Sequence, residues 1–172
     1  MATFEKIAFT EVGAGGTSAI DFTVIPSTFT DLSIVLSLRT NRTNDATGDE
    51  VYVYFNNSNT SVSSRILYGA GSGSGASYSS ASYIINLGAD AQAGTSNTFG
   101  NMNVYIPNYA GSTNKSVSLD GVSENNATGA YASLSAGLWS NTAAINQVTF
   151  KPINGTTFLQ YSSATLYGIK KA

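Results

Sequence analysis

The sequence predicts an all-β protein, an antiparallel β-sandwich of jelly-roll-like type, with residues 1–172 forming a single domain. Three observations favour this fold class. Apolar and polar residues alternate with a period of two over short segments, which is typical of strands with one buried face. Turn-forming residues separate these segments at intervals typical of a sandwich. The alanine-rich stretches are interrupted by Ser, Asn, Gly and β-branched residues, which disfavour a helix.

The strand segments can be followed in chain order. In Ser18–Val24 the apolar side chains alternate with Asp and Thr, and in Asp31–Arg39 four aliphatic residues alternate with polar ones. In Glu50–Asn56 apolar and tyrosine residues alternate, which indicates that both faces are covered there. The stretch 126–139 is ambiguous, and its alternation favours a strand. The remaining expected strands are Phe4–Val12, Val62–Tyr68, Ser82–Leu87, Asn97–Ile106, Lys115–Val122, Ala130–Trp139, Ile145–Lys151 and Ser162–Lys170.

Turns and loops occupy the intervening positions. Val12–Ser18 is a glycine-rich connection, and Pro26 and Pro107 end strands because proline cannot donate a hydrogen bond to a β-ladder. Thr40–Asp49 is polar throughout. We expect residues 69–82 to form a flexible Gly/Ser loop, since this composition has no core to bury.

Composition excludes several classes of function. The chain has no His and no Cys, so Ser-His or Cys-His nucleophile pairs and imidazole or thiolate metal sites cannot form within it. Eight Lys and Arg residues, scattered along the chain, cannot make the basic stripe that binds nucleic acid. No segment has the length and apolarity of a membrane helix or a signal peptide. We therefore expect no nucleic-acid or membrane partner, and synthesis in the cytoplasm.

Two motifs suggest ligands and are better explained otherwise. The glycines of Gly69–Gly75 resemble a phosphate-binding loop, but no helix and no lysine follow them. Asp45, Asp49 and Glu50 could supply oxygen ligands to calcium, but their spacing matches no EF-hand, and a solvated acidic loop is the favoured interpretation. We expect no cofactor and no metal.

Asp120 and Glu124 are the pair of carboxylates considered for catalysis. Glycoside hydrolysis needs two such groups about 5–10 Å apart on either side of the sugar. Four residues around one turn do not establish that arrangement, and we expect a protein without enzymatic activity.

Aromatic side chains are the candidate contact residues. Tyr52, Tyr54 and Val35 are predicted on outward faces of strands, while Tyr105 and Tyr109 flank Pro107 and are expected to be exposed. Tyrosines of this kind serve an oligomer interface or stack on the rings of a glycan. The alternative is that they pack within the sheets, with their hydroxyls reaching water.

Several stretches together resemble a known group of proteins, the small virion structural proteins of tailed bacteriophages common among aquatic and cyanobacterial phages. The resemblance covers most of the chain, and its matching stretches are Ala2–Ala8, Ile20–Leu32, Asn97–Asn101, Tyr105–Gly111, Gly137–Ile145, Phe158 and Tyr161–Ile169. Similar C-terminal ends occur in head-decorating and tail-fibre-like proteins. The group supplies no catalytic residues to carry over.

This resemblance implies a place on the virion, most simply the capsid surface. We expect a capsid decoration or cement protein that binds the major capsid protein, stabilises the head and forms a homotrimer. The chain shows no repetitive shaft, no coiled-coil heptads and no separate anchor, which favours decoration over a fibre. The alternative is a tail-fibre or receptor-binding knob that contacts a host surface glycan.

Overall fold

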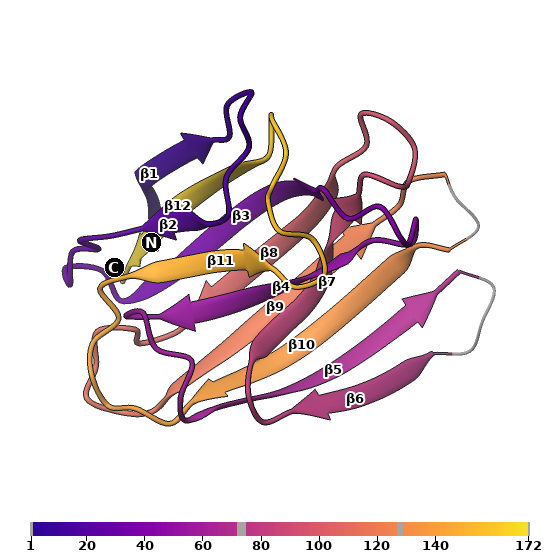
Figure 1. Ribbon diagram of the computed structural model, residues 1–172. Helices are drawn as coiled ribbons and strands as arrows, with labels where there is room; N and C mark the ends of the chain where they lie inside the picture. Colours follow the sequence, from indigo (N-terminus) through magenta and orange to yellow (C-terminus); the bar gives the residue numbers. More distant parts are fainter. Residues whose placement is uncertain (1, 72–74, 127–128, 172) are drawn as a thin grey trace.

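The computed structural model describes residues 2–71, 75–126 and 129–171, and this part of the chain is all β-structure (Figure 1). It contains twelve strands in the described ranges. Their bounds are β1 Thr3–Glu11, β2 Ile20–Phe22, β3 Asp31–Thr40, β4 Asp49–Phe55, β5 Val62–Ala70, β6 Ala76–Ser80, β7 Ile84–Ala91, β8 Gly100–Ile106, β9 Lys115–Ser123, β10 Tyr131–Trp139, β11 Val148–Pro152 and β12 Ser163–Lys170.

The strands form two layers. The large sheet has the order β1-β12-β3-β8-β9-β10-β5-β6 and is antiparallel throughout. The small sheet has the order β2-β11-β4-β7 and lies in front of the large one in Figure 1. The predicted antiparallel sandwich is therefore confirmed, with sheets of unequal size.

The main core lies between the two layers, where the alternation placed it. On β3, Leu32, Ile34, Leu36 and Leu38 are buried, and they meet Val53 and other inward residues of the small sheet. Trp139 at the end of β10 is buried with Phe55 of β4, at a ring-centroid distance of 5.7 Å. Burial of these side chains supplies most of the driving force for joining the layers.

The two sheets join at one short parallel contact, in which Arg39 and Thr40 of β3 pair with Asp90 and Ala91 of β7. The Arg39 guanidinium donates hydrogen bonds to the carbonyl oxygens of Thr95 (2.6 Å) and Thr98 (2.8 Å). Burial raises the pKa of Asp90, and the positive charge of Arg39 opposes that rise. The joint thus places a buried carboxylate near Arg39, while the arginine holds the loop after β7 by hydrogen bonds.

Strand β7 lies unusually close to β8, β9 and β10 because glycines stand at the crossing points. A side chain at Gly100 would contact the Gly88 carbonyl at 2.6 Å, and one at Gly137 would contact Ile84 at 2.7 Å. Gly121 of β9 faces Gly88 and Asn86 of β7. Such contacts are too short for any Cβ, so this approach of the two layers requires glycine.

Two expectations about the elements need correction. The stretch 69–82 was expected to be a flexible loop, yet β5 extends to Ala70 and β6 occupies Ala76–Ser80; residues 72–74 lie outside the described part. The strand expected at Ser82–Leu87 instead runs over Ile84–Ala91. Strand β6 forms because it pairs with β5, which fixes small residues in a strand, whereas β7 takes its bounds from its pairing with β4 and β3.

Gly121→Ala tests the close approach of β7. The new methyl group would overlap the Asn86 side chain and lie 2.9 Å from the Gly88 Cα, and backbone cannot move aside cheaply. We expect the free energy of unfolding, measured by urea titration, to fall by about 1–3 kcal/mol. The matched control is Gly69→Ala, because no atom lies within 4 Å of that position. Equal effects of the two substitutions would contradict the close-packing account.

Candidate functional site

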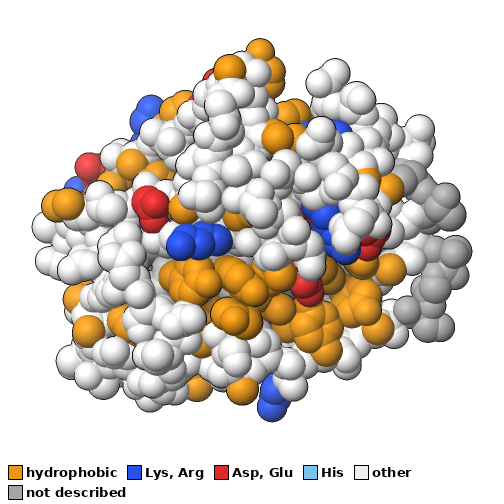
Figure 2. Space-filling view, viewed as in Figure 1, with side chains coloured by type: hydrophobic (Ala, Val, Ile, Leu, Met, Phe, Trp, Pro, Cys, Tyr) orange, Lys and Arg blue, Asp and Glu red, His pale blue; other side chains and the backbone are white. Residues whose placement is uncertain are grey.

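Six tyrosines gather where the small sheet ends above β5 and β6. Tyr52 and Tyr54 stand on the outward face of β4, and Tyr83 precedes β7. The others are Tyr68, Tyr78 and Tyr131, from β5, β6 and β10. These six residues are called the tyrosine groove below. Figure 2 shows a continuous strip of hydrophobic side chains in this region, with acidic and basic groups along its border.

The groove has its own small core. Ile66, Ile85 and Leu87 are buried there, and five of the six tyrosines pack around them. The floor forms because β5 and β6 of the large sheet extend past β7, the edge strand of the small sheet, so that inward residues of one sheet meet outward residues of the other. The tyrosines cover this apolar floor while remaining half-buried.

The rings make direct contacts with one another. Tyr52 stacks on Tyr83 with centroids 4.2 Å apart, and meets Tyr54 edge-on at 5.7 Å. Tyr68 makes edge-on contacts with Tyr78 at 6.0 Å and with Tyr131 at 5.7 Å. Stacked and edge-on pairs at these distances are the favourable geometries for aromatic rings. The groove is therefore a preformed aromatic surface.

One end of the groove is polar. The Tyr78 hydroxyl donates a hydrogen bond to Glu50 Oε1 at 2.5 Å. A cavity of 210 Å³ lies beside this pair, lined further by Arg42, Asp45 and Asn154. A second cavity, of 240 Å³, lies beside Tyr54 and is lined by Asn57, Asn59, Thr149 and Lys151.

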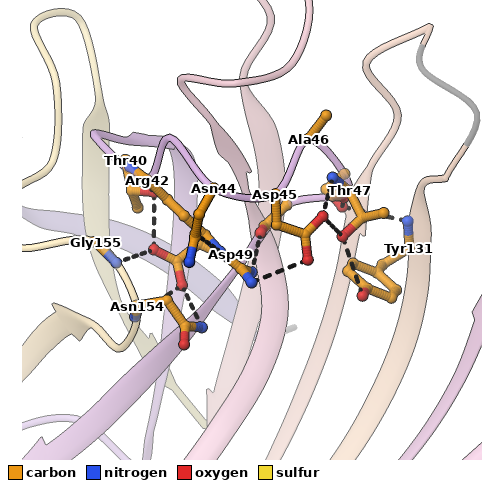
Figure 3. Close-up of polar contacts among 12 residues, drawn as sticks. Thr40, Arg42, Asn44, Asp45, Ala46, Thr47, Asp49, Tyr131, Asn154 and Gly155 are labelled. Atoms are coloured by element: carbon orange, nitrogen blue, oxygen red, sulfur yellow. Dashed lines mark hydrogen bonds and ion pairs between the residues drawn. The ribbon is translucent and has the colours of Figure 1, made fainter.

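The loop before β4 holds the polar end in place (Figure 3). Arg42 donates to the Gly48 carbonyl at 2.6 Å and forms an ion pair with Asp45 at 2.9 Å. Thr47 donates to Asp45 Oδ1 through its hydroxyl at 2.6 Å, and the same hydroxyl lies 3.2 Å from that of Tyr131. The hydrogen bond from Thr47 lowers the pKa of Asp45.

The acidic residues of this loop are used within the protein. Asp49 is buried and accepts hydrogen bonds from the Thr40 hydroxyl (2.8 Å), the backbone and side chain of Asn154, and the Gly155 N–H (2.8 Å). Among the described residues, no three acidic, His or Cys side chains are grouped closely enough to hold a metal ion. The carboxylates therefore act as acceptors that shape the loop.

The structure places Tyr105 and Tyr109 in different environments, one exposed and one buried. Tyr105 lies on the outer face of β8 with 41% of its surface exposed, and its hydroxyl donates to Asp31 at 2.9 Å. The expected exposure of Tyr109 is wrong: its side chain is fully buried, and its hydroxyl donates to the Pro26 carbonyl. A buried phenol needs such an acceptor, and the segment before the turn at 27–28 supplies it.

The two carboxylates considered for hydrolysis, Asp120 and Glu124, have different structural roles. Asp120 lies on the exposed face of β9 and accepts a hydrogen bond from Asn103 at 3.1 Å. Glu124 caps the backbone N–H of Asn126 at 2.8 Å. In the Gly69–Gly75 stretch, the described residues belong to or flank strands, and no helix follows them.

A second surface lies on the opposite side of β5 and β10. Leu67 and Leu134 are direct cross-strand partners, and 59% and 56% of their respective surfaces are exposed. Val122 and Leu138 are exposed on the same side, with Ala132 and Ala136 between them. Hollows of 440 Å³ and 420 Å³ flank the two leucines. These six residues are called the outer apolar face, and exposed apolar patches of this kind mark interaction surfaces.

Tyr68, Tyr78, Tyr83 and Tyr131 were not singled out from the sequence. The predicted strands could have located three of them, since Tyr68, Tyr83 and Tyr131 each lie in an expected strand. Tyr78 lies in the stretch that was expected to be a loop. The outward positions of Tyr52 and Val35 agree with the alternation of their strands.

Comparisons with known proteins add little. No protein-family model and no curated protein matches the chain. Among solved structures, it is weakly similar to the binding domain of botulinum neurotoxin DC in complex with SialylT, with a TM-score of 0.29 and 11% identity. That alignment covers 99% of this chain and 41% of the other, so the chain spans less than half of that neighbour. A similarity this weak supports no inference about function. Within the described residues, no helix is long and apolar enough to cross a membrane.

Alkaline titration tests the packing of the groove. Burial, followed by the neighbouring Tyr83, raises the pKa of Tyr52 to about 12, and burial together with Glu50 raises that of Tyr78. Because the folded state favours the neutral phenol, this stabilisation is complete below the ordinary tyrosine pKa of about 10 and is lost as the pH rises through the folded values. We expect urea titrations to show a loss of stability above about pH 10 that is smaller in Tyr52→Phe than in the wild type. Parallel losses in both proteins would contradict the raised pKa.

Proposed function

We propose that the protein is a non-enzymatic structural protein of a tailed-phage virion, a capsid decoration protein that binds the major capsid protein and stabilises the head. The observation that carries this proposal is the outer apolar face, considered together with the resemblance to phage virion proteins. The face offers leucine, valine and alanine side chains on regular strands, which provide a rigid platform. A protein surface with matching apolar side chains is the partner that such a platform would bind.

The charge distribution supports a protein partner on this face. Arg65 and Asp120 border the leucine pair, and the remaining neighbours on adjacent strands include Ser77, Ser79 and Ser118. A weakly charged face with an apolar centre has little desolvation cost to overcome on docking. Binding the assembled shell and not the free subunit would stabilise the shell by mass action.

Self-association accompanies this role in the proposal, with a homotrimer as the expected state. Strand β6 is an edge of the large sheet, and Ala76–Ser80 carries no charge and no proline. The opposite edge, β1, has Glu5, Lys6 and Glu11 and a register shift after Lys6, which are features that discourage edge pairing. The unprotected edge favours contact with another copy.

The docking surface can be tested with Leu134→Asp. A carboxylate in the centre of an apolar interface has to be desolvated without a partner, so binding to purified capsids that lack the protein should weaken at least about tenfold. Val24→Asp is the matched control, because Val24 is 89% exposed in a separate loop, and Asp tolerates its positive φ. Co-sedimentation measures both variants. Equal binding by wild type and Leu134→Asp would contradict the docking surface, and absence of the protein from purified particles would contradict the whole proposal.

Oligomerisation has a separate test. If the folded subunits associate, the melting temperature should rise with protein concentration, and sedimentation equilibrium should give three times the monomer mass of 17.9 kDa. A monomer mass together with a melt independent of concentration would exclude the trimer.

A further inference from the structure

The tyrosine groove joins two polar cavities through an aromatic surface. On the outward face of β4, Glu50, Tyr52 and Tyr54 follow one another at every second residue, so they span roughly 14 Å along the strand. Glu50 lines the 210 Å³ cavity at one end, and Tyr54 lines the 240 Å³ cavity at the other. An extended ligand would therefore meet hydrogen-bonding groups at both ends and tyrosine rings between them.

The charges along the groove balance. Arg42 is paired with Asp45 at 2.9 Å, and Glu50 accepts the hydrogen bond of Tyr78. At the other end, Lys151 lies 5.7 Å from the centre of the Tyr54 ring. The lining thus holds two cations and two carboxylates, with Arg42 paired to Asp45, Glu50 bound to Tyr78 and Lys151 placed over the Tyr54 ring. Such a lining offers no excess positive charge to a phosphate or sulfate and favours a ligand without net charge.

The hydrogen-bonding groups at the two ends are of mixed type. Asn59 offers both a donor and an acceptor, and Lys151 donates. The other groups are partly engaged within the protein: the Asn57 Oδ1 accepts from Gln147, the Asn154 amide donates to Asp49, and the Thr149 hydroxyl donates to Asp21. What they still offer a ligand is the amide N–H groups of Asn57, the carbonyl oxygen of Asn154 and an acceptor site on Thr149. Hydroxyl groups, which also donate and accept, are the complement of this set. An extended peptide would instead need a free strand edge for its backbone, and β4, the strand that connects the two cavities, has none because β7 and β11 pair with its two sides.

We propose that the tyrosine groove is a binding site for a neutral carbohydrate chain. The apolar faces of the sugar rings lie against Tyr52 and Tyr83, and the sugar hydroxyls bind the amide and hydroxyl groups of the two cavities. Each cavity is smaller than the roughly 300–1,000 Å³ of a drug-sized pocket, which suits one ring of a longer chain. This site is separate from the outer apolar face, so it adds a second binding activity to the proposed virion role.

A glycan array followed by calorimetry tests the site. The array carries neutral glucose-, mannose-, galactose- and N-acetylhexosamine-based oligosaccharides beside sulfated and sialylated ones. We expect binding confined to neutral chains, and titration calorimetry with the best neutral hexasaccharide then gives its affinity. Tyr83→Ala should weaken that affinity at least about tenfold, because the stacking platform is lost. Tyr83→Phe, which keeps the ring, should stay within about threefold.

Further variants keep the test independent of folding and of the virion role. Asn59→Ala changes an exposed side chain in the second cavity and should weaken binding several-fold without affecting the melting temperature. Tyr105→Ala removes an exposed tyrosine outside the groove and should leave the affinity unchanged. Leu134→Asp should bind the hexasaccharide normally while failing on capsids, and Tyr83→Ala should show the reverse. The proposal is overturned if no neutral chain on the array binds, if an anionic chain binds more tightly, or if Tyr83→Ala binds like the wild type.

Discussion

The close approach of β7 to the large sheet is the constraint on which the rest of the structure depends. At Gly88, Gly100, Gly121 and Gly137 there is no room for a side chain, and at Gly100 and Gly121 backbone lies directly against backbone. Asn86 is buried at this contact, where its side chain donates to Ser135 at 3.0 Å and accepts from Ser133 at 3.1 Å. Because these buried polar groups are all hydrogen-bonded, they fix one arrangement of the two layers, since any shift would leave them without partners.

This position of β7 also creates the groove. The inward side of β7 carries Ile84, Asn86 and Gly88, so the alternating residues Ile85 and Leu87 lie on the other side. The large sheet continues past β7 through β5 and β6, so these two side chains need a cover of their own. Tyrosines suit this task, since a ring can rest on the apolar floor while its hydroxyl stays near water.

How far the sequence predicts this structure depends on which contacts decide each feature. Alternation located most of the strands, since one buried face imposes a period of two. The sequence did not predict strand β6, because Ser, Gly and Ala do not produce an alternating pattern, and only pairing with β5 makes this segment a strand. The burial of Tyr109 depends on Pro26, far away in sequence. The burial of Asp49 could have been predicted, since Asp49 alternates in step with Val51 and Val53 and so points inward. The tyrosine groove could not have been predicted, because its side chains come from five separate segments.

The two proposed binding surfaces follow from one property of a strand. On β5, Leu67 points to the outer apolar face and Tyr68 to the tyrosine groove, and on β10 Leu134 and Tyr131 point to the same two sides. Successive side chains alternate between faces, so strands that dock by their leucines necessarily present their tyrosines on the other side. A subunit seated on a shell through the outer apolar face would therefore hold its groove away from that shell. Attachment and ligand capture then need no conformational change to coexist, and a register shift of one residue in either strand would destroy both surfaces together.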